Sequence, residues 1–486
     1  MQPLHVYFEL LHANLPILCI GVGMGIYRCA HEWLVWFNEA HYALTAGLLG
    51  SGDLFVIADM GKVVGVVFYV TLCYAVDRFR RNSALLVLPS LMLMLGYVAP
   101  SLWALGIDPG PAVFLVGLVV GGMGAGMLFA QWIEVCGRLA PLRAMQTLAL
   151  SYVVRTLVLP LLTDCGPLVG VISIMVLAGS SFIQVELGSS LLGDRVRVSN
   201  CPAAFGHTRE MARQIPGHSA RSGYAILLIW VCVFTFSYGL GEAATGLGHS
   251  VVASGLGGVL PALLVLVLAA MLGDRFDWNV LYIVSIPLMA AGLIAIEFFG
   301  VNPSIAQVLV SAGMVAFELL VYTMACAYAR HGGVSAMLSG GCVRVAGLIF
   351  ADAAVLLIRL GGTGTNAEGG SAFGFDISAI VAISIFATLV MGFFMFLPSV
   401  QEHFEQRQIG SLGYREARRD VIELRGAKAG LSPREMTVFR LMVEGKMSSQ
   451  ISEELFISNG AVRAHCSRIY EKFGVHSRKD FDELMR

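Results

Sequence analysis

Long apolar stretches recur along most of this chain, and short polar segments separate them. A helix needs about 20 apolar residues to cross the hydrocarbon core of a bilayer. Twelve stretches meet that length, at Leu15–Phe37, Leu54–Val76, Ser83–Leu105, Pro111–Val135, Leu142–Leu162, Pro167–Leu192, Gly223–Glu242, Val251–Gly273, Trp278–Gly300, Ser304–Ala329, Ala336–Leu360 and Asp376–Leu397. They are too long and too continuously apolar for barrel strands. The pattern therefore predicts an all-α, polytopic membrane bundle of twelve spans.

Composition agrees with this pattern. The 486 residues are 57% hydrophobic and only 13% charged, whereas soluble chains average about 25% charged residues. A soluble fold of this size would need more polar surface. No Lys or Arg precedes the first stretch, which contains Arg28 and lacks a small-residue cleavage site, so we expect it to stay as a span and not to be a signal peptide.

Basic residues are concentrated in alternate loops. If the N-terminus is inside, the inner loops contain Arg78, Arg80, Arg81, Arg138, Arg143, Arg195, Arg197, Arg209, Arg213, Arg221, Arg275 and Arg330. The outer loops contain acidic residues and no Lys or Arg beyond Arg359 at a span end. Cytoplasmic loops of membrane proteins collect Lys and Arg. We therefore expect both termini to be cytoplasmic.

The longest internal loop, residues 193–222, divides the spans into a first half (1–192) and a second half (223–398). The same pattern, D-R-F-x-x-N, follows the second span at Asp77–Asn82 and the eighth at Asp274–Asn279. Parallel six-span repeats are typical of one large group of transporters. We therefore predict two six-span pseudo-repeats.

Two motifs resemble the major facilitator superfamily. The loop Cys73-x-x-x-Asp77-Arg78-x-Arg80-Arg81 resembles that family's G-x-x-x-D-R-x-G-R-K loop, with both of its glycines replaced. The fourth span, with glycines between Gly117 and Gly126, resembles the family's glycine-rich fourth helix. The arginine that the family places before these glycines is absent, which argues against proton coupling. The resemblance implies a central cavity lined by the first, second, fourth, fifth, seventh, eighth, tenth and eleventh spans.

Ionisable side chains inside spans are costly and usually face a cavity or a partner. We assign to this cavity seven that fall on spans which the resemblance places around it: Arg28, Asp59, Lys62, Arg155, Glu318, Arg344 and Asp352. We hypothesise that they form a polar pocket in which the three arginines bind an anionic or phenolic small molecule. The alternative is a set of structural ion pairs between the halves. Asp59 and Lys62, three residues apart, could simply pair with each other.

After Pro398 the chain becomes polar, with a linker at 399–430 and a small helical domain at 431–486. Ser432-Pro433-Arg434-Glu435 is a helix start, in which Ser caps, Pro occupies the first helical position and Glu completes a capping box. A second short helix follows, and we expect Ser448 to cap it. A third begins after Ser458 and ends at Gly474, and a fourth begins near Asp480. Short, closely spaced helices of this kind predict a helix-turn-helix.

This domain resembles the LuxR-type DNA-binding domain along its whole length, through Leu431–Glu435, Gly445, Leu455–Ser458, Val462-Arg463-x-His465, Lys472–Val475 and Ser477-Arg478. The resemblance implies base contacts from Arg463, Ala464 and Ser467. Arginine can bind guanine bidentately, and alanine can contact only a thymine methyl group. The resemblance also implies phosphate contacts from Lys446, Asn459, Arg468 and Lys472. The partner would be promoter DNA, bound as a dimer on paired half-sites. The alternative is a helical bundle that binds protein.

We therefore expect a one-component transcriptional regulator in the bacterial inner membrane, whose transporter-like domain senses a small molecule. A working transporter that couples transport to gene expression is the alternative. No nucleotide-binding loop, catalytic motif or metal-ligand spacing is visible, so we expect no enzymatic activity, no cofactor and no metal.

Overall fold

A computed structural model describes residues 2–37, 51–75, 83–191, 219–244, 251–272, 276, 278–299, 302–332, 335–362, 377–395, 425–426, 429–443, 446–455, 457–475 and 481. The chain divides into two compact units, Met1–Glu405 and Gln406–Arg486, each described by itself below.

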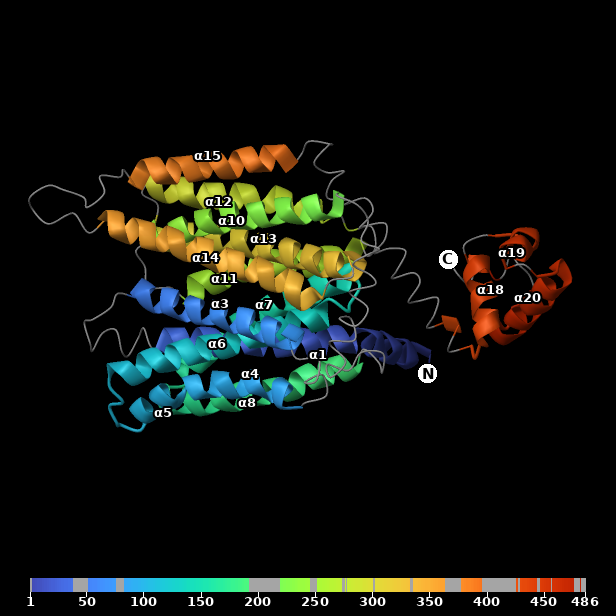
Figure 1. Cartoon of the computed structure of the whole chain (residues 1–486), viewed down its shortest axis with the longest axis horizontal. Coiled ribbons are helices and arrows are strands. Elements are labelled where there is room, and N and C mark those ends of the chain that lie inside the picture. The colour runs from blue at the N-terminus through green and yellow to red at the C-terminus, as the bar shows by residue number, and fades with distance from the viewer. Residues whose placement is uncertain are drawn as a thin grey trace, which may run out of the picture. The chain divides into compact units, whose positions relative to one another are not determined.

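Helices α1 to α15 form the first unit (Figure 1). They are α1 (Gln2–Phe37), α3 (Ser51–Ala75), α4 (Ser83–Gly96), α5 (Val98–Ala104), α6 (Pro111–Cys136), α7 (Pro141–Asp164), α8 (Pro167–Leu191), α10 (Ser219–Ala244), α11 (Val251–Leu272), α12 (Asn279–Phe299), α13 (Pro303–Gly332), α14 (Ala336–Gly362) and α15 (Ile377–Met395). Each of the twelve predicted spans coincides with a helix, and the third consists of α4 and α5 together. Helix α1 begins at Gln2, before the first predicted span at Leu15.

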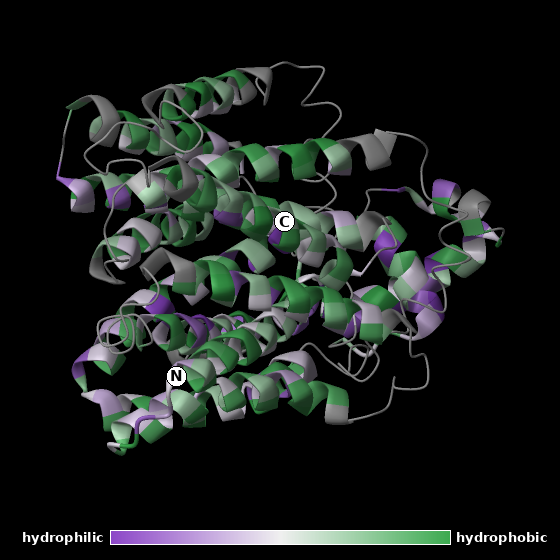
Figure 2. Ribbon diagram, turned by 60° about the vertical axis from the view of Figure 1, so that its left-hand side comes forward, coloured by the Kyte–Doolittle hydropathy of each residue, from purple (hydrophilic) through white to green (hydrophobic). Residues whose placement is uncertain are grey.

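Within the described residues, nine helical segments are long and apolar enough to cross a membrane. Helices α12 and α15 contain shorter apolar stretches, Val280–Ala295 and Ile380–Val390. Large apolar side chains such as Leu157, Val176 and Phe386 are about two-thirds exposed on the outside of the bundle, and apolar residues cover most of these helices (Figure 2). An apolar exterior on this scale suits lipid and not water. The protein is therefore a multi-pass membrane protein.

The helix contacts of the first half are repeated in the second. Helix α1 packs on α7 and α8, and α6 packs on α3 and α4. Six spans later, α10 packs on α14 and α15, and α13 packs on α11 and α12. The halves then meet through two equivalent pairs, α7 with α11 and α3 with α14. This arrangement confirms the two six-span pseudo-repeats, although residues 77–82, 274, 275 and 277 of the repeated D-R-F-x-x-N pattern lie outside the described residues.

Glycines bring α3 and α6 into direct backbone contact, as small residues do where membrane helices pack closely. A Cβ atom added to Gly126 would lie 2.2 Å from the carbonyl oxygen of Lys62, and one added to Gly65 would lie 2.1 Å from that of Met123. Because backbone atoms cannot rotate away as side chains can, neither position has room for a methyl group.

Replacing Gly126 with Ala should therefore lower the thermal unfolding midpoint of the detergent-solubilised protein by several degrees, since overpacking costs about 1–3 kcal/mol. The matched control is Gly258→Ala in α11, where the nearest atom to the new methyl is a Val315 side-chain carbon at 3.4 Å. Equal midpoints for the two variants would contradict this account.

The second unit contains α18 (Pro433–Val443), α19 (Ser448–Leu455) and α20 (Asn459–Phe473). The predicted capping box is present: the Ser432 amide donates to the Glu435 carboxylate at 2.8 Å, and the Glu435 amide donates to the Ser432 hydroxyl at 3.4 Å. Gly474, with φ of 66°, ends α20 as expected. The apolar faces meet in one core of Val438, Phe439, Leu441, Met442, Ile451, Val462, Cys466, Ile469 and Phe481.

The second helix of this unit begins differently from the prediction. Ser448 is its first residue and not its cap. The cap position belongs to Met447, whose amide donates to the Gln450 side-chain oxygen at 2.8 Å. A glutamine three residues into the helix thus satisfies the backbone amide of the cap residue, as the Glu or Gln of a capping box does. Of the predicted fourth helix only Phe481 is described, and it is fully buried against Phe439 and Phe473.

Candidate functional site

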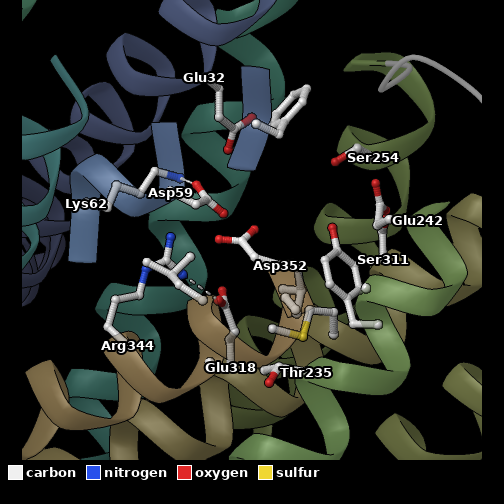
Figure 3. A pocket seen from close by; sticks show the side chains of 18 of the residues that line it. Glu32, Asp59, Lys62, Thr235, Glu242, Ser254, Ser311, Glu318, Arg344 and Asp352 are labelled. Carbon is white, nitrogen blue, oxygen red and sulfur yellow. Dashed lines mark hydrogen bonds and ion pairs between the residues drawn. The ribbon is translucent and has the colours of Figure 1, made fainter. Parts of the chain in front are cut away.

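A cavity of about 360 Å³ lies between the two halves of the membrane unit. This volume is within the usual range for sites that enclose small molecules. Its walls come from α1, α3 and α7 of the first half and from α10, α11, α13 and α14 of the second. The close-up in Figure 3 shows charged side chains projecting into it from both halves.

All seven residues that the sequence assigned to a pocket line this cavity: Arg28, Asp59, Lys62, Arg155, Glu318, Arg344 and Asp352. Three further ionisable residues, His31, Glu32 and Glu242, also line it and were not assigned to the pocket. The first two could have been found, because they lie on the same span as Arg28 within four residues. Glu186, by contrast, is exposed on α8 and does not line the cavity.

Glu318 in α13 binds groups from three other helices. Its carboxylate accepts a hydrogen bond from Arg344 of α14 at 3.0 Å and lies 3.9 Å from Arg28 of α1. It also accepts a hydrogen bond from the Tyr152 hydroxyl of α7. Arg28 stacks over the Tyr152 ring at 4.0 Å, in cation–π geometry. Since Arg28 and Tyr152 belong to the first half and Glu318 to the second, this cluster joins the two halves.

The remaining basic groups of the cavity also have acidic partners. Arg155 of α7 donates through Nε to Glu32 of α1 at 2.7 Å, and its terminal nitrogen donates to Ser254 of the second half at 3.1 Å. The Lys62 ammonium nitrogen lies 2.5 Å from an Asp59 carboxylate oxygen, so these two residues form the ion pair that their spacing of three residues allows. All three arginines therefore face carboxylates already, so an anionic ligand would have to displace Glu32 or Glu318.

The cavity extends toward one end of the bundle. It is lined there by Trp36 near the end of α1, by Ala243 near the end of α10 and by Ile358 near the end of α14. At the opposite end, the Glu134 carboxylate of α6 accepts the Met337 amide at the start of α14 at 2.9 Å. A carboxylate at a helix N-terminus is favourable because it satisfies a free amide and the helix dipole. This contact holds the two halves together at that end.

In the second unit, α20 presents the residues that the LuxR-type resemblance assigned to DNA. Ser458 caps the helix by accepting the Ala461 amide at 3.2 Å. The proposed base-contact residues Arg463, Ala464 and Ser467 are all exposed on it, and so is the proposed phosphate contact Asn459 at its start. Lys446, another proposed phosphate contact, is half-buried before α19.

The other two proposed phosphate contacts have protein partners. Lys472 donates to the Glu435 carboxylate and to the Gly430 carbonyl, each at 2.8 Å. The Arg468 guanidinium lies 3.6 Å from Glu435 and also contacts His465. The hydrogen bond from Lys472 and then that from the Ser432 amide lower the pKa of Glu435 from 4.5 to about 2. These contacts tie α20 to α18, so Lys472 has a structural role whatever it does with DNA.

The stability of residues 406–486 should fall as the pH drops from about 4.5 to about 2. In that window the unfolded chain binds a proton at Glu435 that the folded unit excludes. Glu435→Gln should remove most of this pH dependence and destabilise the unit at neutral pH. Urea unfolding midpoints at pH 3 and pH 6 measure both effects. Glu471→Gln, which changes an exposed carboxylate on α20, is the control, and an identical pH profile for both variants would contradict the prediction.

Comparison with known proteins identifies the second unit. The family "Bacterial regulatory proteins, luxR family" matches residues 429–482. The spore germination protein GerE of Bacillus subtilis is 44% identical over 61 residues, which cover 12% of this chain and 82% of GerE. The Fimbriae Z protein of Escherichia coli K12 is 47% identical over 47 residues, which are 10% of this chain. This chain therefore spans only about a fifth (22%) of the length of that relative. The chain belongs to the LuxR family of bacterial regulatory proteins and has its helix-turn-helix DNA-binding domain.

Solved structures identify the fold of the membrane unit. The human organic anion transporter MFSD10 (TETRAN) matches with a TM-score of 0.52 and 14% identity, over 78% of this chain and 98% of its own. The major facilitator proton:xylose symporter XylE matches with a TM-score of 0.50 and 15% identity, over 80% of this chain and 96% of its own. The chain therefore fuses a major-facilitator-like membrane fold to a LuxR-type DNA-binding domain.

Proposed function

We propose that this protein is a membrane-embedded, one-component transcriptional regulator whose membrane unit senses a small molecule and controls DNA binding by the LuxR-type domain. The observation that supports it best is the charged cavity between the two halves. Its Glu318 cluster and its Arg155–Ser254 hydrogen bond cross from one half to the other. A molecule bound among these groups would change the contacts that set how the halves pack.

The mechanism is a population shift. A ligand with higher affinity for one arrangement of the halves favours that arrangement by its difference in affinity, and a ligand with equal affinity for both does nothing. The linker at 399–430 then changes the spacing or pairing of the DNA-binding domains. Paired half-sites would let two domains bind together, which suits a dimer on promoter DNA.

The positive-inside distribution of arginines supports an inner-membrane protein with both termini in the cytoplasm. In that orientation, α1 runs outward. The cavity then extends toward the outer side, and the Glu134–Met337 contact lies on the cytoplasmic side. The ligand would reach the cavity from outside the cell, and the DNA-binding domain would reach the chromosome from the membrane surface.

The first test is transcript profiling of a strain that lacks the protein, against a panel of small molecules. A responding promoter then serves as the reporter. Arg155→Ala and Arg344→Ala should abolish the response to the inducing molecule, because each removes a contact at the cavity wall. DNA binding by residues 399–486, which contain neither arginine, is the control. An unchanged response in both variants would remove the cavity from the mechanism.

The alternative is a transporter whose C-terminal domain couples transport to gene expression, and the transporter-like fold is the observation that favours it. Uptake by vesicles containing the purified protein separates the two: sustained accumulation of the ligand would support transport. A third reading, a membrane scaffold that binds protein through its C-terminal domain, would be refuted if residues 399–486 retard DNA sequence-specifically.

A further inference from the structure

Asp352, one of the cavity carboxylates, forms no ion pair among the residues that the structure describes. Asp352 of α14 is only 5% exposed, and its Oδ2 atom has no hydrogen-bond partner among the residues that the structure describes. Figure 3 shows this carboxylate in the middle of the cavity, close to Asp59 and Glu318. Burying a carboxylate without a partner is costly. The site is therefore complete only when something supplies a positive charge or hydrogen-bond donors.

The basic side chains that line the cavity already pair with other carboxylates. Five carboxylates and four Lys or Arg residues line it. Lys62 already pairs with Asp59, Arg155 with Glu32, and both Arg28 and Arg344 with Glu318. Neutral polar atoms nearby, the ring nitrogen Nε2 of His31 and the hydroxyl of Ser311, are also buried and have no partner in the described part of the chain.

We infer that the ligand of this cavity is a small organic cation that carries N–H groups, a protonated amine, with Asp352 as the counter-ion. This rests on the proposed function and names its ligand class, replacing the anionic or phenolic ligand that the three arginines suggested from the sequence. An N–H cation matches the unpaired acidic oxygen, whereas a carboxylate would add a sixth acid to the cavity wall.

The walls favour an organic cation over a metal ion. No group of three or more His, Cys, Asp or Glu residues in the described segments could hold a metal. The cavity of about 360 Å³ is many times larger than an inorganic cation and is also lined by Trp36, Phe55, Tyr238 and Met314. Aromatic and aliphatic walls beside the carboxylate of Asp352, which forms no ion pair, fit an apolar molecule with a cationic end.

The test uses the purified full-length protein in detergent and two matched sets of probes. The first set is benzylamine, benzyl alcohol and benzoate, and the second is tryptamine, tryptophol and indole-3-acetate. We expect at least one amine to raise the thermal unfolding midpoint, by roughly 3 °C or more at saturation, with little effect from its alcohol or its carboxylate. Because a hydrogen bond to a charged group is stronger than one to a neutral amide, Asp352→Asn should weaken amine binding roughly tenfold or more.

Glu186→Gln is the matched control, because it removes a span carboxylate that lies outside the cavity. Stabilisation by a carboxylate but not by its amine would overturn the inference. So would the absence of stabilisation by both amines, stabilisation by Na⁺ alone, or an amine effect that Asp352→Asn leaves unchanged. The comparison of amine with alcohol uses the wild-type chain, so it stands even if the Asn variant cannot be purified.

DNA binding by the full-length protein separates this inference from the proposed function. If amines bind through Asp352 but leave DNA retention unchanged, the regulator hypothesis is wrong and the ligand class stands. If a carboxylate alters DNA retention and amines do not, the regulator hypothesis stands and the ligand class is wrong.

Discussion

Replacing Glu318 with Ala should destabilise the membrane unit more than any other single change in the cavity. The substitution leaves two arginines, Arg28 and Arg344, without the carboxylate that faces them, and it removes the acceptor for the Tyr152 hydroxyl. Removing one partner of a buried ion pair costs about 3–5 kcal/mol, because the other charge stays buried and uncompensated. Arg28, Glu318 and Arg344 keep 12–20% of their side-chain surface exposed, so we expect the lower end, about 3 kcal/mol.

The thermal unfolding midpoint of the detergent-solubilised protein measures this loss. Glu318→Gln keeps the side-chain shape and an acceptor for Tyr152 but loses the charge, so it should fall between the wild type and the Ala variant. Glu186→Ala, on the exposed face of α8, should remain close to the wild type. If Glu318→Ala unfolds no earlier than Glu186→Ala, then the cluster does not hold the halves together.

The same cluster shows where sequence reasoning succeeds and where it stops. Ionisable residues within spans are conspicuous, because lipid makes them expensive, and this was enough to select seven residues that line one cavity. The partner of each residue was predictable only when it lay on the same helix. Asp59 and Lys62 are three residues apart, and they pair as their spacing allowed.

Pairs between distant spans gave no such signal. Arg155 and Glu32 are 123 residues apart, and Tyr152 and Glu318 are 166 apart. Only the packing of α1, α7 and α13 brings these groups together, and apolar periodicity does not specify that packing. The sequence therefore predicted three arginines available to an anion, whereas the fold had already given each of them a carboxylate.

In the DNA-binding domain local rules were sufficient for most features. The Ser432–Glu435 box, the Ser458 cap and the Gly474 terminus depend on interactions within three or four residues, and all three are present. The start of α19 differed from the prediction because Ser448 lies one position too late to cap the helix. Met447 occupies the cap position, and the Gln450 side chain accepts a hydrogen bond from its amide. The N-terminus of α19 therefore depends on a side-chain hydrogen bond, which the preference of serine for cap positions did not predict.

Replacing Arg463 with Ala should abolish sequence preference at one base pair of the operator. Arg463 is exposed on α20, and no hydrogen bond or ion pair holds it among the described residues. Its guanidinium is therefore available to bind guanine O6 and N7, a contact that discriminates by about 1–3 kcal/mol. We expect specific binding to weaken by roughly 5- to 150-fold, with non-specific binding much less affected.

Residues 406–486 and a duplex selected by them from a random pool provide the measurement. Lys446→Ala is the informative comparison, because loss of a phosphate contact should weaken all duplexes alike and reduce the salt slope by about 1. Arg434→Ala removes another exposed arginine, from α18, and should leave the selected sequence unchanged. If the Arg463 variant selects the same sequence with the same affinity, then α20 does not read bases through this arginine, and Ser467 becomes the next residue to substitute on the same exposed face.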